Sequence, residues 1–176
     1  VYPNNGNGTF GAGVNFGTGS DYTLSVACGD SDRDGDLDLA VGNWMQSVVY
    51  VNQGDGTFGV GPSIGTASDD TWSVAWGDWD ADGDLDLAAG RMTGQSLIYP
   101  NAGDGSFGTG VAFGGSDDTH SLAWGDFDND GDLDLAAGRY EQQAFVYLNQ
   151  APDNVAIEKT PATSTIPAGN TLHYTI

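Results

Sequence analysis

Gly125-Asp-Phe-Asp-Asn-Asp-Gly-Asp-Leu-Asp134 is the stretch that decides the fold, because the same pattern occurs three times in the chain. The other copies are Gly29-Asp-Ser-Asp-Arg-Asp-Gly-Asp-Leu-Asp38 and Gly77-Asp-Trp-Asp-Ala-Asp-Gly-Asp-Leu-Asp86. Each copy places carboxylates at alternate positions, where they would repel one another strongly unless a cation neutralised them. Ca²⁺ is a hard cation that takes about 6–8 oxygen ligands from a flexible loop. The pattern therefore predicts three calcium loops and about three Ca²⁺ per chain.

The ligand positions resemble those of an EF-hand, with acidic residues at positions 1, 3, 5, 7 and 9 and glycine at position 6. The predicted metal residues are Asp30, Asp32, Asp34, Asp36, Asp38, Asp78, Asp80, Asp82, Asp84, Asp86, Asp126, Asp128, Asp130, Asp132 and Asp134. Position 12 is Val41, Ala89 or Ala137, so the bidentate glutamate of an EF-hand is missing. We therefore expect the aspartate at position 9 to supply the closing carboxylate. Position 7 would bind through its backbone carbonyl, with its side chain directed outward.

The three loops belong to a longer repeat, because Asp30, Asp78 and Asp126 follow one another at intervals of 48 residues. Around the second loop, residues 73–76, 85–89, 96–99 and 106–113 alternate or carry strand-forming residues between glycine-rich turns. We expect Leu37, Leu85 and Leu133 to point into the sheet. The sequence predicts an all-β fold of propeller-type blades, each of four antiparallel strands, in about three repeats of 48–49 residues.

Two modules are predicted. Residues 1–150 contain the repeats, and residues 151–176 lack a calcium loop and form two alternating, strand-like segments around a Pro/Ser/Thr link. We expect the aromatic residues of the repeats to pack within and between blades, notably Trp72, Trp76, Trp124, Phe113 and Phe145. Cys28 stands where the other repeats have Trp76 and Trp124, so we expect it to be a small buried residue.

Composition narrows the classes of partner. The chain has 25 acidic residues against 4 basic ones, a net charge of −21. Nucleic acid is a poor partner because binding it relies on clustered Lys and Arg. Long apolar runs are absent, so no membrane insertion is expected.

The segment from Ser121 to Gly138 resembles the FG-GAP/VCBS repeat of integrin α-subunit propellers and of many bacterial surface proteins. The resemblance covers residues 1–150 and implies that Ca²⁺ binds between the first two strands of each blade, with ligands on the opposite face. It also implies an extracellular or cell-surface location. Residues 155–176 resemble the opening of an Ig-like repeat of secreted bacterial proteins.

The predicted ligand face consists of residues that join the second and third strands or begin the first, namely Trp44, Met45, Arg91, Met92, Arg139, Tyr140 and His120. Ordinary polar turns are the alternative interpretation of these positions, and Arg91 and Arg139 would then pair with nearby aspartates. No Ser/His/Asp or Cys/His arrangement recurs, so the chain is not expected to be an enzyme.

Three functions remain open: a calcium-binding adhesion or scaffold module with a protein or glycan ligand, a carbohydrate-binding propeller, and a regulatory propeller attached to an absent enzyme. Residues 9–16 would complete the last blade, but a ring of three blades is too tight, because propellers have about 4–8. Partners, further blades or an open array are the alternatives, and open blade edges favour self-association.

Overall fold

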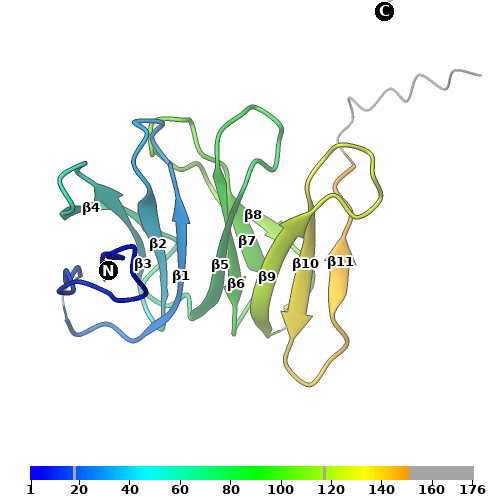
Figure 1. Cartoon of the computed structure of the whole chain (residues 1–176). Helices are drawn as coiled ribbons and strands as arrows, with labels where there is room; N and C mark the ends of the chain where they lie inside the picture. The colour runs from blue at the N-terminus through cyan, green and yellow to red at the C-terminus, as the bar shows by residue number, and fades with distance from the viewer. Residues whose placement is uncertain (18, 117, 151–176) are drawn as a thin grey trace, which may run out of the picture.

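The computed structural model describes residues 1–17, 19–116 and 118–150, and the prediction of an Ig-like segment lies outside them. The described residues are all β, without a helix that could span a membrane. In this part of the chain, eleven strands form three antiparallel sheets, which we call blades 1 to 3 (Figure 1). Blade 1 consists of β1 (Thr23–Gly29), β2 (Asp38–Asn43), β3 (Ser47–Asn52) and β4 (Phe58–Ile64), and blade 2 of β5 (Thr71–Gly77), β6 (Asp86–Arg91), β7 (Ser96–Tyr99) and β8 (Val111–Phe113). Blade 3 consists of β9 (Thr119–Gly125), β10 (Asp134–Arg139) and β11 (Phe145–Tyr147).

Each blade is a meander whose strands pair in chain order, as the repeats predict. The register recurs from blade to blade: Cys28 pairs with Leu39, Trp76 with Leu87 and Trp124 with Leu135. Blades 1 and 2 have the four predicted strands, whereas the described part of blade 3 has three. The predicted all-β, blade-type fold is therefore confirmed, with the fourth strand of blade 3 missing from the described residues.

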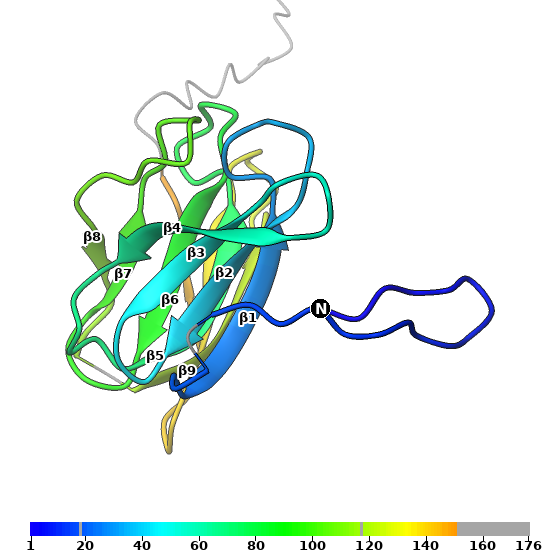
Figure 2. The same cartoon turned by 90° about the vertical axis from the view of Figure 1, so that its left-hand side faces the viewer.

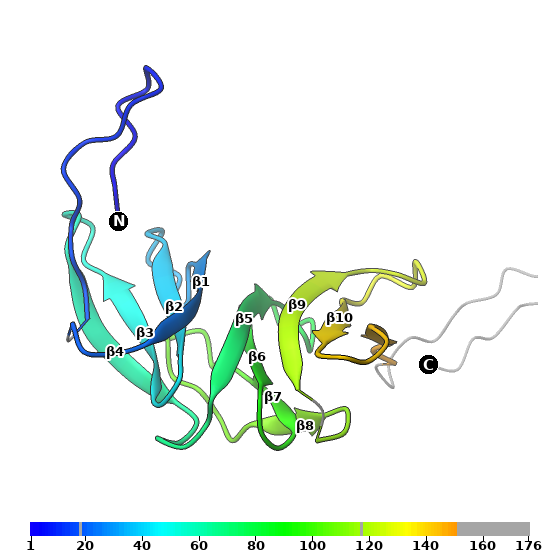
Figure 3. The same ribbon diagram turned by 90° about the horizontal axis from the view of Figure 1, so that it is seen from below.

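The three blades form an open fan. Figure 3 shows β1, β5 and β9 along the inner side of an arc, with blades 1 and 3 at its two ends. The three aspartate loops, which connect β1 to β2, β5 to β6 and β9 to β10, all lie at the top of Figure 1. The strand ends that carry the predicted ligand face therefore lie at the opposite end of the sheets.

The core lies between blades rather than within one. The ring of Trp76 lies against Gly29 of blade 1, and its indole Nε1 donates to the carbonyl of Ala27 at 3.2 Å. Trp124 repeats this contact one blade later, against Gly77 and the carbonyl of Ala75, also at 3.2 Å. The interblade packing predicted for these two tryptophans is confirmed. Val49, Val74 and Leu87 belong to the same buried cluster between blades 1 and 2.

Two of the packing predictions were wrong. Cys28 is exposed rather than buried, because the described residues place no blade in front of blade 1 where Trp76 and Trp124 find theirs. Phe145 is also exposed, although its ring lies beside Tyr147, on the side of β11 that faces blade 2. The sequence predicts which positions face a neighbouring blade, but burial depends on whether that neighbour is present.

Candidate metal centres

The three aspartate loops share a backbone that alternates between ordinary and left-handed conformations. Position 6 is Gly35, Gly83 or Gly131, with φ between 91° and 100°. Position 4 also has positive φ in each loop, although it carries a side chain: φ is 60° at Arg33, 59° at Ala81 and 63° at Asn129. Non-glycine residues adopt this conformation only where the surroundings stabilise it. The two reversals fold each loop tightly, and the aspartates at positions 1, 3 and 9 of each loop come together.

The aspartate at position 9 is the anchor of each loop, and it is the first residue of β2, β6 or β10. Asp86 has no exposed surface, and its two oxygens accept hydrogen bonds from the backbone N–H groups of Trp79 and Asn101, both at 2.8 Å. One bond thus holds the start of the loop and the other holds the turn that follows the third strand. Asp38 and Asp134 are equally buried and make the corresponding bonds.

Three carboxylates meet in each loop, from positions 1, 3 and 9. The groups are Asp30, Asp32 and Asp38; Asp78, Asp80 and Asp86; and Asp126, Asp128 and Asp134, whose candidate ligand atoms lie within 4.8 Å of one another. Oδ1 of Asp30 and Oδ1 of Asp78 are inaccessible to solvent and have no hydrogen-bond partner. Leaving a buried carboxylate oxygen unpaired is costly. An all-oxygen cluster with such orphaned atoms fits a hard cation.

Positions 5 and 7 lie outside these groups. The carboxylate of Asp34 accepts a hydrogen bond from the backbone N–H of Asp36 at 2.8 Å, within the same loop. At position 7, Asp84 forms an ion pair with Arg33 of the preceding loop, so its side chain faces away from its own group. The sequence did not predict this contact between loops. Leu37 is 58% exposed, so the inward orientation expected for it was wrong, and Leu39 fills that role instead.

Without a cation, the geometry opposes ionisation of these carboxyls. Burial raises the pKa of Asp32 and Asp80 above the ordinary value, and the neighbouring carboxylates of each loop raise it further. Burial also raises the pKa of Asp86, against the two backbone hydrogen bonds that lower it. A divalent cation among the three carboxylates would reverse the effect by favouring their charged forms.

A recurring asparagine connects neighbouring loops. The side-chain Nδ2 of Asn101 donates to the carbonyl of Leu85 in its own loop at 3.0 Å and to that of Ser31 in the preceding loop at 2.7 Å. Asn149 likewise donates to the carbonyl of Trp79 at 2.7 Å. The sequence analysis did not predict this role. The signal for it was that asparagine recurs at the end of the third strand or just after it, as Asn52, Asn101 and Asn149.

A scan against protein-family models matches the chain to the FG-GAP-like repeat three times, over residues 1–41, 32–89 and 79–137. The matches together run over most of the chain, and each of the three contains a complete aspartate loop. The chain belongs to the FG-GAP-like repeat family. A search of curated proteins found no match to it.

The end of the FG-GAP sheets opposite the loops carries the predicted ligand face. The backbone N–H groups of Trp44, Met92 and Tyr140 donate to the carbonyls of Tyr22, Asp70 and Asp118, at 2.9–3.0 Å, so the three turns have one geometry. Trp44, Met45 and Tyr140 are exposed.

Three residues of this predicted face have well-defined contacts. The ring of His120 stacks on Trp72 at 4.1 Å and on Tyr140 at 5.3 Å between centroids. Arg91 forms a largely buried ion pair with Asp69, as the alternative interpretation expected. Arg139 lies over the ring of Phe145, 5.3 Å from its centroid, so both arginines are held in place by contacts within the protein.

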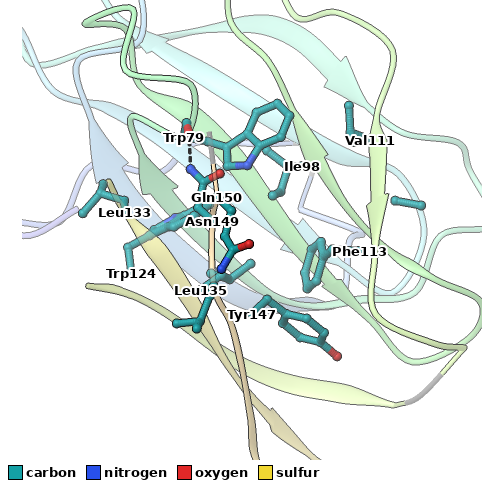
Figure 4. A pocket seen from close by; sticks show the side chains of 12 residues that line it. Trp79, Ile98, Val111, Phe113, Trp124, Leu133, Leu135, Tyr147, Asn149 and Gln150 are labelled. Carbon is teal, nitrogen blue, oxygen red and sulfur yellow. Dashed lines mark hydrogen bonds between the residues drawn. The ribbon is translucent and has the colours of Figure 1, made fainter. Parts of the chain in front are cut away.

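Blades 2 and 3 of the FG-GAP array also enclose an apolar pocket of about 170 Å³, beside the outer strands. Figure 4 shows Ile98, Phe113 and Tyr147 around it, with Asn149 reaching Trp79 at its rim. Its lining is mainly aromatic and aliphatic, so it does not suit a cation. We interpret it as part of the packing between blades.

Proposed function

We propose that the chain is a calcium-stabilised, non-enzymatic adhesion or scaffold module of a secreted or cell-surface protein. Membership of the FG-GAP-like repeat family supports a repeat module of this type. The observation that carries the calcium proposal is the group of three carboxylates in each loop, with buried and unpaired oxygens at Asp30 and Asp78.

Calcium has a structural task in this proposal. It neutralises each group of carboxylates and ties the loop between the first two strands of a blade, so that metal binding and folding are coupled. The flanking elements are strands, which offer no pair of helices for a sensor-type opening. Extracellular modules bind Ca²⁺ with dissociation constants of about 10⁻⁴–10⁻³ M, and this range is sufficient for a structural ion outside a cell.

The proposal excludes catalysis as the main role. The grouped carboxylates are assigned to the cation, which leaves them unavailable as a free acid/base pair. His120, between two aromatic rings, is assigned to packing. The net charge of −21 argues against nucleic acid, so a protein or glycan surface is the proposed partner.

A direct test compares bound calcium and the melting temperature in the wild type, Asp78→Asn and Asp36→Asn, each in excess chelator and in millimolar Ca²⁺. We expect about three ions in the wild type and about two in Asp78→Asn, because the substitution removes a charge aimed into the middle group. Asp36→Asn is the matched control: it changes the same type of residue in a neighbouring loop, at a position assigned to a backbone ligand, and should retain three ions. A wild type that binds no calcium and melts identically in both conditions would refute the proposal.

A second candidate function, carbohydrate binding, is favoured by the aromatic residues exposed at the end opposite the loops. Trp44 and Tyr140 occupy equivalent turns of blades 1 and 3, and flat aromatic rings are suited to packing against apolar faces of ligands. A glycan screen with the wild type and Trp44→Ala tests it. Binding that Trp44→Ala abolishes would support this candidate, whereas the absence of any glycan signal would leave adhesion to protein as the proposal.

A further inference from the structure

The junction between blades 1 and 2 contains an ion pair that the residues at the equivalent positions of blades 2 and 3 cannot form. Arg33, at position 4 of the first loop, pairs with Asp84, at position 7 of the second. The third loop has Asp132 at position 7, but position 4 of the second loop is Ala81, which carries no charge. We propose that Arg33 is a built-in cation of the first junction, which it holds closed at calcium concentrations too low to close the second.

The guanidinium of Arg33 reaches across the junction and lies over the second loop. A Cβ added to Gly83, at position 6 of that loop, would be 3.1 Å from Nη2 of Arg33. At the equivalent Gly131 of the third loop, an added Cβ would meet no described residue within 4 Å apart from its chain neighbours. The side chain at position 4 is therefore what connects the first loop to the second in this way.

Asp84 is the partner that needs the charge of Arg33. It is 8% exposed, and its carboxylate lies against the backbone of Gly103 in the turn that follows β7. Oδ1 of Asp84 is inaccessible to solvent and has no hydrogen-bond partner among the described residues. A carboxylate removed from water in this way is costly unless an opposite charge accompanies it. Arg33 supplies that charge from a side chain that is itself half-exposed.

The ion pair leaves the candidate calcium group of the second loop intact. The three carboxylates that meet in this loop are Asp78, Asp80 and Asp86. Asp84 is not among them, because position 7 is assigned to a ligand from the backbone. Arg33 therefore does not take the place of the calcium ion, and both can act on the second loop at once.

The other polar contacts that recur between blades are equivalent at the two junctions. Oγ of Ser25 accepts from the backbone N–H of Val74 at 3.2 Å across the first junction. Oγ of Ser73 accepts from that of Leu122 at 3.1 Å across the second. The tryptophan and asparagine contacts described above also have equal lengths at the two junctions. Among these recurring contacts, the ion pair of Arg33 is therefore the difference between the junctions.

Neighbouring loops repel each other when no cation is bound. All three loops lie at one end of the sheets (Figure 2), and the side chain of Asn101 reaches from blade 2 to the carbonyl of Ser31 in the first loop. Each loop has five aspartates, and Arg33 lowers the formal charge of the first from −5 to −4. Charges at such short range interact strongly where water is partly excluded. Arg33 thus replaces one repulsive interaction between loops by an attractive one.

The consequence is an order in which the junctions open. As calcium is withdrawn, the neutralisation of the carboxylate groups is lost at both junctions, but the first keeps its pair of opposite charges. Blade 3 should therefore separate from blade 2 at a calcium concentration that still holds blades 1 and 2 together. This inference rests on the calcium-stabilised module proposed above, and it adds which junction depends more on the ion.

The backbone amides of Val74 and Leu122 are matched reporters, because each donates a hydrogen bond across one junction from an equivalent position. The test follows their hydrogen exchange by heteronuclear NMR on the whole chain, from excess chelator to millimolar Ca²⁺, and counts bound calcium in the same samples. We expect Val74 to become protected at a Ca²⁺ concentration about fivefold lower than Leu122, which is the upper range for an ion pair with an exposed partner.

Two pairs of variants assign this difference to the charge at position 4. Arg33→Gln should raise the calcium midpoint of Val74 to that of Leu122, whereas Arg33→Lys should keep most of the difference. Ala81→Arg should lower the midpoint of Leu122. Ala81→Gln is the matched control, since it adds a long polar side chain without a charge. The backbone admits these substitutions, because φ is 60° at Arg33 and 59° at Ala81.

The outcomes separate this inference from the proposed function. Coincident midpoints in a wild type that binds calcium, or a midpoint of Val74 that Arg33→Gln leaves unchanged, would overturn the inference and leave the proposed function intact. An equal effect of Ala81→Gln and Ala81→Arg would also overturn it, because bulk rather than charge would then close the junction. A chain that binds no calcium, and whose hydrogen exchange does not respond to it, would overturn both.

Discussion

Gly77→Ala tests the packing between blades 2 and 3 with a single methyl group. Gly77 is not in the left-handed region, so alanine is allowed there by the backbone. The added Cβ would lie 2.7 Å from Cδ1 and Cγ of Trp124 and 2.8 Å from Cδ2. Real Cβ atoms do not approach rings so closely, so the indole must move, and its hydrogen bond to Ala75 would be strained. Overpacking of this kind costs about 1–3 kcal/mol, which corresponds to a decrease in melting temperature of about 2–12 °C for a chain of this size.

Gly125→Ala is the matched control, because Gly125 is the equivalent residue of blade 3. Its added Cβ would meet Cε2 of Phe127 at 3.3 Å and no tryptophan. Thermal unfolding of both variants, followed by near-ultraviolet circular dichroism in millimolar Ca²⁺, should show a clear decrease for Gly77→Ala and little change for Gly125→Ala. Equal decreases in the two variants would show that the tryptophan contact does not set the stability of the junction, and the reasoning would be wrong.

Three further predictions concern the junctions and the loops. Trp124→Phe removes the indole donor to Ala75 and should lower the free energy of unfolding by about 1–3 kcal/mol in urea titrations; an unchanged urea midpoint would contradict the contact. Asn101→Ala should weaken calcium binding about tenfold in both adjoining loops, whereas Asn52→Ala should affect its own loop alone, as calorimetric titration can show. Metal-free protein should become more stable as the pH falls from 7 towards the ordinary value of 3.8, because the folded state, with the raised pKa of Asp86, binds protons that the unfolded state does not. Calcium-loaded protein should respond in the opposite direction, and melting curves across this pH range decide between the two signs.

Much of the fold could be predicted from the sequence because the same pattern of residues occurs in three repeats. The 48-residue interval, the glycine-rich turns and the alternation around each loop together predict blades, and the positions of Trp76 and Trp124 predict the packing between them. The sequence also indicates which aspartates form each loop. It does not show that positions 1, 3 and 9 meet while Asp34 turns back to its own backbone, because that depends on the left-handed residue at Arg33.

The errors come from long-range contacts, which local patterns do not encode. The alternation of apolar and acidic residues predicts that Leu37 points into the sheet. However, β2 begins one residue later, at Asp38, whose side chain is buried, and Leu37 stays exposed. Cys28 has the same place in its sheet as the packed Trp76 and is nevertheless exposed, since a side chain at this place is covered only by a preceding blade. The ion pair between Arg33 and Asp84 joins two repeats through residues that differ from copy to copy, so repetition gives no sign of it.

The contacts between loops imply that the proposed calcium sites would not act independently. In a repeat array, stability is approximately a sum of terms within repeats and terms between nearest neighbours. Asn101 contributes to both. Its backbone N–H donates a hydrogen bond to Asp86 within its own repeat, and its side chain donates one to the carbonyl of Ser31 in the preceding loop. A cation that orders the second loop would therefore also order the first loop around Ser31. Asp86, the third carboxylate of the second group, holds the turn at Asn101 from which this contact to the first loop is made. Among the described residues, the middle loop has such a neighbour on each side and the outer loops have one, so the calcium proposed at the middle loop would contribute most to holding the three blades in one array.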